Sequence, residues 1–253
     1  MSLLNPHSGN RPEPVIEPAP NAFPKIAGAD LAAAVAGERI AGDFHDSIRV
    51  GSERVLFGLL DVAGRREDNR EILRTAQQIF RNFGAELFSG SDINEANAMT
   101  ELCLHLNRSL IEVADGVHPC PAFVACYHER LGTLCYTNAG HTPGLLRDPT
   151  GISELPSTGL PLGLFSHATC EAPMVAMQKN SALLLVSRGV VEAENHAGHS
   201  GDDFSLERVK QSFQNPISGA QSLCVAVLEA VDTFGAHVPA VNDRTALALV
   251  RSA

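Results

Sequence analysis

The sequence contains no tryptophan and two tyrosines among its 253 residues, and aromatic residues make up 5% of the chain. Proteins that bind single-stranded nucleic acid stack bases on aromatic side chains, so this composition disfavours that class. Basic residues are not in excess either, since the formal net charge is -10. The sequence contains no cluster of basic residues of the kind that binds a phosphate backbone, and it contains no Gly-rich phosphate-binding loop. We therefore expect no nucleic-acid or nucleotide partner.

Long apolar runs are also missing. No stretch reaches the roughly 20 apolar residues that a membrane-spanning helix needs, and the N-terminus has neither the basic start nor the apolar core of a signal peptide. We therefore expect no membrane association. The six cysteines form no CxxC pair, and most lie in apolar runs. This pattern favours reduced core residues over a zinc site or a disulfide frame, and it predicts a cytoplasmic protein.

Hydrophobic residues make up 44% of the chain, which is enough to build the core of one domain. Residues 1–22 contain five prolines and few apolar residues. Because proline removes hydrogen-bond donors, we expect a disordered tail there, or alternatively the remnant of a linker. The domain is then expected to cover residues 23–253.

Apolar spacing predicts both strands and helices. Strands are expected over 49–60, 122–127, 131–138, 145–155, 181–186 and 246–250, with hairpin turns at 128–130 and 148–151. Helices are expected over 68–83, ending near Gly84, from Ser91 through Leu110, and over 222–234. Consecutive hairpins require antiparallel pairing, so the predicted class is α+β, with antiparallel sheets covered by helices.

Two acidic turns are the centre of the functional prediction. Asp43 lies in Gly-Asp-Phe-His-Asp at 42–46, and Asp61 opens Asp-Val-Ala-Gly at 61–64. If the intervening strands pair, both carboxylates lie at neighbouring strand ends. Two carboxylates in that position can share a hard divalent cation such as Mg²⁺ or Mn²⁺.

Six motifs, in their order and spacing, resemble the stage II sporulation E (SpoIIE) family, a bacterial branch of the metal-dependent (PPM, type 2C) serine/threonine protein phosphatases. They are AGDFHD at 41–46, DVAG at 61–64, YTNAGHTP at 136–143, GLPLG at 159–163, SRGVVEA at 187–193 and NDRT at 242–245. The resemblance covers residues 24–253. It implies a four-layer αββα sandwich with a dinuclear Mn²⁺ or Mg²⁺ centre, whose bridging water attacks phosphoserine or phosphothreonine.

The resemblance also implies a role for each matched position. Asp61 corresponds to the carboxylate that bridges both metals, the Val62 carbonyl to a backbone ligand, and Asp43 to the residue that serves the second metal. Arg188 and Asn242 stand where the family has the two aspartates of the first metal site. We therefore expect one ion at Asp43 and Asp61 and an empty first site.

Charge balance leads to the same expectation. Asp43 and Asp61 offset about one divalent ion, whereas Arg188 adds a positive charge. A guanidinium about 4 Å from a divalent ion, at an effective dielectric near 20, costs roughly 8 kcal/mol. We predict that the Arg188 guanidinium takes the place of the first metal and pairs with Asp61. Alternatively, Arg188 grips the substrate phosphate while a single ion supplies the water.

Asp46, Asp243 and His45 are candidate replacements for the missing ligands. Neighbouring residues of a strand point to opposite faces, so Asp243 needs a local distortion to replace Asn242. His141 either touches the pocket or is a structural histidine in a tight turn.

Two further groups of residues have alternative interpretations. Arg66, which follows Arg65, stands where the family usually has a second glycine, so the freedom of glycine at positive φ is lost there. Arg65 and Arg66 either contact phosphate or a partner or form a solvated pair. The loop with His196, His199, Asp202 and Asp203 either binds a metal or is solvated.

Two functions follow. The first is a protein phosphatase with one metal or a rebuilt centre, acting on a phosphoprotein such as an anti-anti-sigma factor. The second is a catalytically silent pseudophosphatase that binds a regulatory protein.

Overall fold

The computed structural model describes residues 23–37, 42–64, 67–195, 202–214, 219–235 and 242–252. These residues form two five-stranded antiparallel sheets, ordered β1-β10-β9-β6-β7 and β2-β3-β4-β5-β8. The first sheet contains β1 (Ala29–Ala36), β6 (Gly144–Asp148), β7 (Gly151–Leu155), β9 (Ala182–Val186) and β10 (Arg244–Arg251). The second contains β2 (Phe44–Val50), β3 (Arg54–Leu60), β4 (Ala122–His128), β5 (Thr133–Ala139) and β8 (Met174–Ala176).

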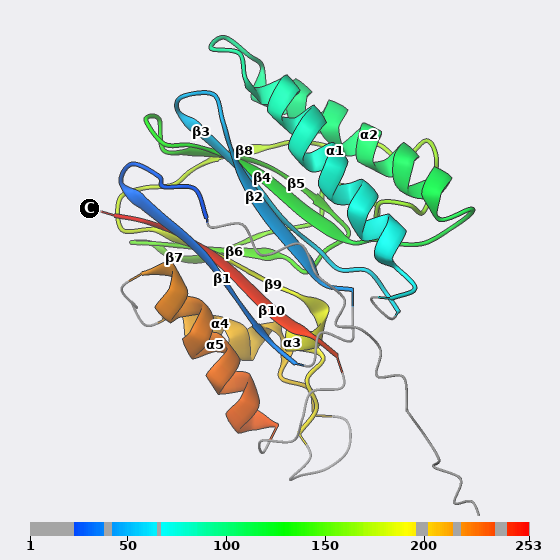
Figure 1. Cartoon of the computed structure of the whole chain (residues 1–253). Coiled ribbons are helices and arrows are strands. Elements are labelled where there is room, and N and C mark those ends of the chain that lie inside the picture. Colours follow the sequence, from blue (N-terminus) through cyan, green and yellow to red (C-terminus); the bar gives the residue numbers. More distant parts are fainter. Residues whose placement is uncertain are drawn as a thin grey trace, which may run out of the picture.

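Helices cover the outer face of each sheet (Figure 1). On the second sheet lie α1 (Arg70–Phe88) and α2 (Glu95–Val113), and on the first lie α3 (Arg188–Val191), α4 (Ser205–Gln214) and α5 (Ala220–Phe234). Apolar side chains fill three layers, one between the sheets and one under each helical layer. The predicted αββα sandwich is therefore confirmed. Of the described residues, no helix combines the length and the apolar character that crossing a membrane requires.

Several predicted boundaries were wrong. The run 49–60 is the end of β2, a turn over 51–53 and β3, and Gly51 makes the turn at a φ of +65°. The first helix continues past Gly84 to Phe88. A Cβ on Gly84 would lie 2.7 Å from Leu56 Cδ2, so the glycine allows α1 to approach β3 closely instead of ending the helix.

Several elements were not predicted. The alanine-rich segment 29–36 is a strand because it pairs with β10 along its whole length, which outweighs the helical preference of alanine. The helices α3 and α4 and the short strand β8 were also missed. The second helix begins after Asn94, whose Oδ1 accepts a hydrogen bond from the Asn97 amide at 3.0 Å, and not at Ser91.

Three of the predictions concern residues outside the described ranges: the tail at 1–22, Arg65 and Arg66, and His196 and His199. The expected disorder of the tail therefore stays a prediction. All six cysteines are described, buried and free of disulfide bonds, as predicted.

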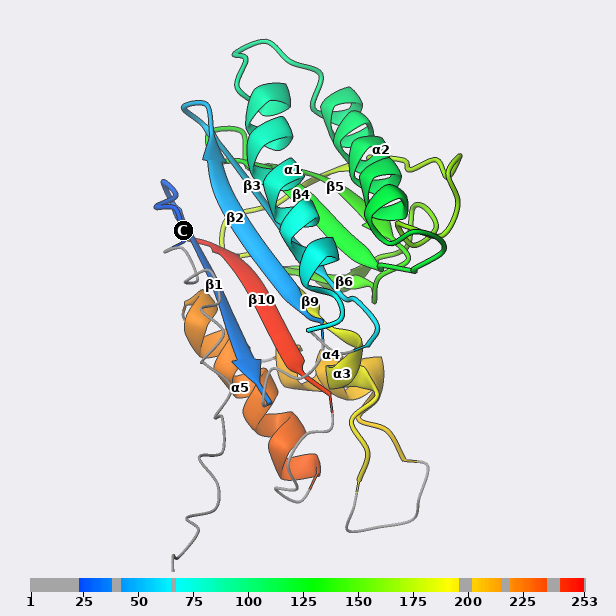
Figure 2. The same ribbon diagram turned by 45° about the vertical axis from the view of Figure 1, so that its right-hand side comes forward.

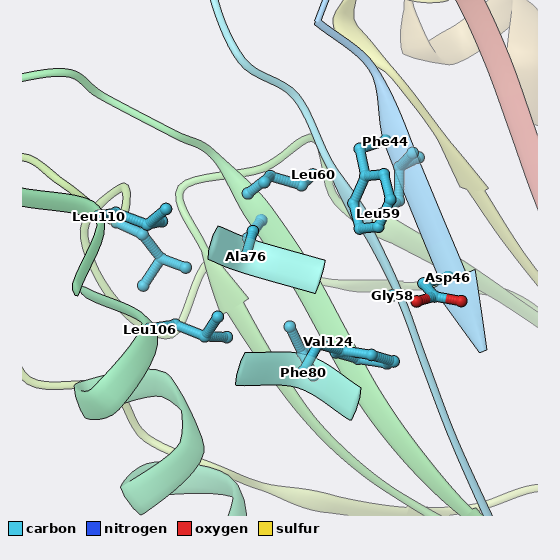
Figure 3. Close-up of a pocket in the computed structure, with 12 residues that line it drawn as sticks. Phe44, Asp46, Gly58, Leu59, Leu60, Ala76, Phe80, Leu106, Leu110 and Val124 are labelled. Carbon is cyan, nitrogen blue, oxygen red and sulfur yellow. The ribbon is translucent and has the colours of Figure 1, made fainter. Parts of the chain in front are cut away.

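An apolar pocket lies between α1, α2 and the second sheet, with Asp46 of β2 at its edge (Figure 3). The Asp46 carboxylate accepts two hydrogen bonds from the Arg81 guanidinium of α1, at 2.6 and 2.7 Å. Asp46 is buried, and Arg81 is partly exposed. The ion pair thus fixes α1 to β2 and holds Asp46 on the helical side of the sheet.

We predict that Arg81→Ala lowers the free energy of unfolding by about 1 to 3 kcal/mol, because it leaves a buried carboxylate without its cation. Urea denaturation measures the change. Arg74→Ala is the matched control, since its pair with Glu71 lies on the same helix with both side chains more than half exposed, and its loss is expected within about 0.5 kcal/mol. Equal losses in both variants would contradict the assignment.

Candidate active site

The two acidic turns meet at one end of the second sheet. Phe44 of β2 lies opposite Leu60 of β3, so Asp43, just before β2, and Asp61, just after β3, are neighbours. Both carboxylates are buried, with relative exposures of 9% and 7%. A Cβ on Gly42 would lie 2.5 Å from the Val62 carbonyl oxygen, so glycine is required for the turns to approach so closely.

The first sheet supplies the other wall of the site. The Thr245 hydroxyl of β10 donates to Asp43 Oδ2 at 2.8 Å, and the Ser187 side chain, just after β9, also hydrogen-bonds Asp43. Ser187 Oγ in turn accepts from the Thr245 amide at 3.0 Å. Figure 2 shows the start of β2 close to the end of β9 and to α3. The site is therefore built where the two sheets meet.

Ser187 and Thr245 were not among the predicted site residues, although both lie in motifs that resemble the family. Their residue type and position in the sequence could have identified them. Each is a hydroxyl residue next to a buried strand end, and a buried carboxylate requires such donors.

The Asp43 carboxyl is the most perturbed acid of the site. Burial raises its pKa from 3.8 to about 7, and hydrogen bonds from Ser187 and Thr245 only partly oppose this. The nearby carboxylates of Asp61 and Asp243 raise the pKa further. A buried group of like charges is destabilised when all its members ionise, and a bound cation would relieve this repulsion.

Arg188 contacts Asp61 mainly through its backbone. It is the first residue of α3, and its amide donates to Asp61 Oδ2 at 3.1 Å. The guanidinium Nε lies 4.0 Å from the same oxygen and 3.7 Å from Glu192 Oε2, and the side chain is half exposed. The guanidinium thus lies at the mouth of the site, and its replacement of the first metal stays a prediction.

Asn242 and Asp243 differ sharply in burial. Asn242 is exposed, whereas Asp243 has a relative exposure of 3%. A Cβ on Gly189 would lie 2.1 Å from the Asp243 carbonyl oxygen, so α3 packs directly on this turn. Asp243 also acts on the pKa of Asp43. It therefore belongs to the acidic group, whereas Asn242 lies at its outer edge.

The other candidate replacements lie elsewhere. Asp46 binds Arg81 on the helical side of the sheet, and the His45 ring stacks on Phe23 with a centroid separation of 6.2 Å. Asp202, from the polar loop, pairs with Arg208 at 3.1 Å. Of the candidate replacements that the structure describes, Asp243 is the one whose charge acts on Asp43.

His141 is buried at the same end of the molecule. Its amide donates to Asn138 Oδ1 at 2.8 Å, and its Nδ1 lies 3.1 Å from the Thr142 carbonyl oxygen. Nε2 is buried and has no hydrogen-bond partner among the described residues. Burial lowers the pKa of His141 despite the opposing charge of Asp61, which places the imidazole near the acidic group and favours its neutral form.

The acidic group supplies oxygen donors of the kind that suit a hard cation. Asp43, Asp61 and the Val62 carbonyl would hold such an ion, and the Asp243 carboxylate is close enough to raise the pKa of Asp43. The number of ions that this group holds stays a prediction.

Comparison with known proteins identifies a matching family and a relative. A family model described as stage II sporulation protein E (SpoIIE) matches residues 51–252. The phosphoserine phosphatase RsbP of Bacillus subtilis (strain 168) is 24% identical over 158 residues, covering 62% of this chain and 38% of RsbP. The chain therefore spans less than half the length of this relative.

Solved structures share the fold at low sequence identity. The RsbU and RsbW domains of Rv1364c from Mycobacterium tuberculosis align with a TM-score of 0.69 and 21% identity, over 91% of this chain and 63% of that chain. The PP2C phosphatase domain of SpoIIE from Bacillus subtilis, solved with a fragment of its regulatory domain, aligns with a TM-score of 0.67 and 15% identity, over 88% and 62%. These similarities support the two-sheet architecture.

The raised pKa of Asp43 predicts a pH-dependent stability in the presence of EDTA. Between the ordinary pKa of 3.8 and the folded-state pKa of about 7, Asp43 binds more protons in the folded protein than in the unfolded chain. The contribution of Asp43 to the free energy of unfolding therefore falls as pH rises through this window, by roughly 2 to 3 kcal/mol between pH 5 and 7.5. Urea titrations at several pH values measure this slope.

Asp43→Asn should flatten this slope, because the amide does not titrate. Asp92→Asn is the control, since Asp92 is exposed in the connection between α1 and α2 and its replacement should leave the slope unchanged. An unaltered slope in Asp43→Asn would show that Asp43 does not hold the extra proton.

Proposed function

The chain belongs to the stage II sporulation protein E (SpoIIE) family, and on this premise we propose that it hydrolyses phosphoserine or phosphothreonine on a regulatory protein. The family consists of PP2C-type (PPM) phosphatases, which in general depend on Mg²⁺ or Mn²⁺. Because the chain spans only part of its relatives, its activity and its substrate are both part of the proposal.

The observation that carries the proposal is the buried acidic group at the meeting point of the sheets. Burial and two neighbouring carboxylates raise the pKa of Asp43 to about 7. An arrangement that destabilises its own charge is typical of a functional site, since a purely structural role needs no such group. A single divalent ion held by Asp43, Asp61 and the Val62 carbonyl would balance the charge.

We assign each side chain of the site a separate role in hydrolysis. Such an ion, when bound, supplies Lewis-acid activation of a water molecule. Thr245 and Ser187 orient the Asp43 carboxylate through their hydrogen bonds. The half-exposed Arg188 guanidinium lies beside Asp61, and we assign it to the substrate phosphate, because its planar fork matches phosphate oxygens.

A specific observation favours a second candidate, a pseudophosphatase that binds a phosphoprotein without hydrolysis. Arg188 and Asn242 occupy the two positions where the family pattern has aspartates, and the remaining donors fit one ion. Arg188 would still bind the phosphate in this case. The two candidates differ in turnover and share the same binding surface.

The proposed substrate is a phosphorylated regulatory protein. The RsbP relative is named as a phosphoserine phosphatase, and the Mycobacterium tuberculosis protein joins RsbU and RsbW domains in one chain. These names support a regulatory phosphoprotein, with an anti-anti-sigma factor as the expected class.

We predict Mn²⁺-dependent hydrolysis of p-nitrophenyl phosphate by the wild type, and a fall in kcat/KM of at least about 100-fold in Asp61→Ala, the size expected when ion-mediated charge stabilisation is lost. Asp92→Ala is the control and should retain full activity. If activity appears only in the double variant Arg188→Asp/Asn242→Asp, the phosphatase proposal is wrong and the pseudophosphatase proposal is supported.

Metal stoichiometry gives an independent prediction. Titration calorimetry with Mn²⁺ should show one ion per wild-type chain, because the donor set balances one divalent charge. Arg188→Asp/Asn242→Asp should bind two ions, since it restores two carboxylates and removes a cation. Two ions in the wild type would show that Asp243 or another group completes the first site.

A further inference from the structure

Five of the six cysteines lie in the apolar core between the second sheet and its helices. They are Cys103, Cys120, Cys126, Cys135 and Cys170. Cys224 lies in the separate core under the first sheet. The described residues contain no metal-binding group of three, so the cluster is not a soft-metal site. Its distinctive feature is the contact between two of its thiols.

The thiols of Cys103 and Cys170 interact, and each changes the pKa of the other. Other contacts also place Cys170 against α2. The hydroxyl of Thr100, three residues before Cys103 and so on the same face of α2, lies 3.5 Å from the Cys170 carbonyl oxygen. A Cβ on Gly159 would lie 3.2 Å from Cys170 Sγ, so the glycine leaves room for the sulfur.

The two positions differ in their access to solvent. Cys103 lies inside the core, with a relative exposure of 1%. Cys170 has a relative exposure of 6%, but its neighbours Thr169 and Glu171 are exposed. It lies in the segment 156–173, between β7 and β8, which contains no regular strand. Segments of this kind open locally more readily than central strands, and such opening brings Cys170 to solvent.

We propose that Cys103 and Cys170 form a redox-active pair, oxidised by a hydroperoxide to a disulfide that joins α2 to the segment 156–173. The Cys170 thiolate attacks the terminal oxygen of the hydroperoxide ROOH and the O–O bond breaks, giving a sulfenic acid and RO⁻ (hydroxide for hydrogen peroxide), which takes up the proton lost by the Cys170 thiol. The Cys103 thiol then attacks the sulfenic sulfur and forms the S–S bond, and its proton leaves with the sulfenic oxygen as water. The two sulfurs together lose two electrons, and the peroxide gains them.

The electrostatics support this order of attack. The interaction with the Cys103 thiol lowers the pKa of the Cys170 thiol, and the same interaction raises the pKa of Cys103. Cys170 is thus the better thiolate of the two, and thiolates are the reactive form. Cys126 and Cys135 also face each other across β4 and β5, but both are fully buried in central strands.

The disulfide would act close to the candidate active site. Thr158, in the same segment, donates its amide to the Asn138 carbonyl at 2.8 Å. Asn138 Oδ1 in turn accepts from the His141 amide. Oxidation would therefore tie α2 to the segment that supports the Asn138–His141 turn.

The test treats the full reduced chain with hydrogen peroxide and then maps its peptides by mass spectrometry. We expect a cross-linked peptide pair containing Cys103 and Cys170, cleaved by dithiothreitol. The melting temperature should rise by roughly 5 to 10 °C, because the bond closes a long chain loop. This result does not depend on phosphatase activity, so it stands or fails separately from the proposed function.

Cys170→Ala should abolish both the cross-link and the rise in melting temperature, whereas Cys224→Ala should retain them. A cross-link between Cys126 and Cys135 would overturn the proposal. So would sulfinic acid at Cys170 without a cross-link, or a disulfide that lowers the melting temperature. Mapping of the wild type decides the question even if a variant does not fold.

Discussion

The hydrogen bond from Thr245 to Asp43 joins two residues 202 positions apart and links the two sheets at one end of the sandwich. This bond gives the buried Asp43 carboxylate a hydrogen-bond donor. Without a donor, the loss of hydration on burial would destabilise the folded protein. Ser187 connects to both residues, so β2, β9 and β10 are held in one arrangement at this end. The positions of Asp61, Asp243 and Arg188 all depend on this junction.

The junction also explains how Arg188 and Asn242 can stand where the resemblance implies aspartates without loss of the fold. Arg188 begins α3 with its side chain half exposed, and Asn242 is exposed. Replacing a carboxylate at either position removes no buried partner that the sheets require. The contacts that do hold the junction use Ser187, Thr245 and the Arg188 backbone. A change of charge at these two positions therefore leaves the contacts of the junction intact.

The helical layer over the second sheet is attached by ion pairs and apolar contacts, whereas hydrogen bonds from hydroxyl groups hold the junction between the sheets. Two ion pairs connect β2 and β3 to α1 and to the start of α2: Asp46 with the partly exposed Arg81, and Arg54 with Glu95, both buried. Between them lie apolar side chains and most of the thiols. Asp46 was a candidate metal ligand in the sequence, yet it serves this layer, because residues three apart in the extended 43–46 segment point to opposite faces.

The sequence by itself determined the fold class, the central strands and the proximity of Asp43 to Asp61. Buried strands are visible in a sequence as apolar runs, and short turns bring consecutive strands together. It did not determine the role of Asp46, the helix that continues past Gly84, or the hydroxyl donors Ser187 and Thr245. Those depend on contacts between elements that are far apart in the chain. Burial, which sets the charge state of Asp43, is likewise a property of the packed sheets, since desolvation exists only once both walls are in place.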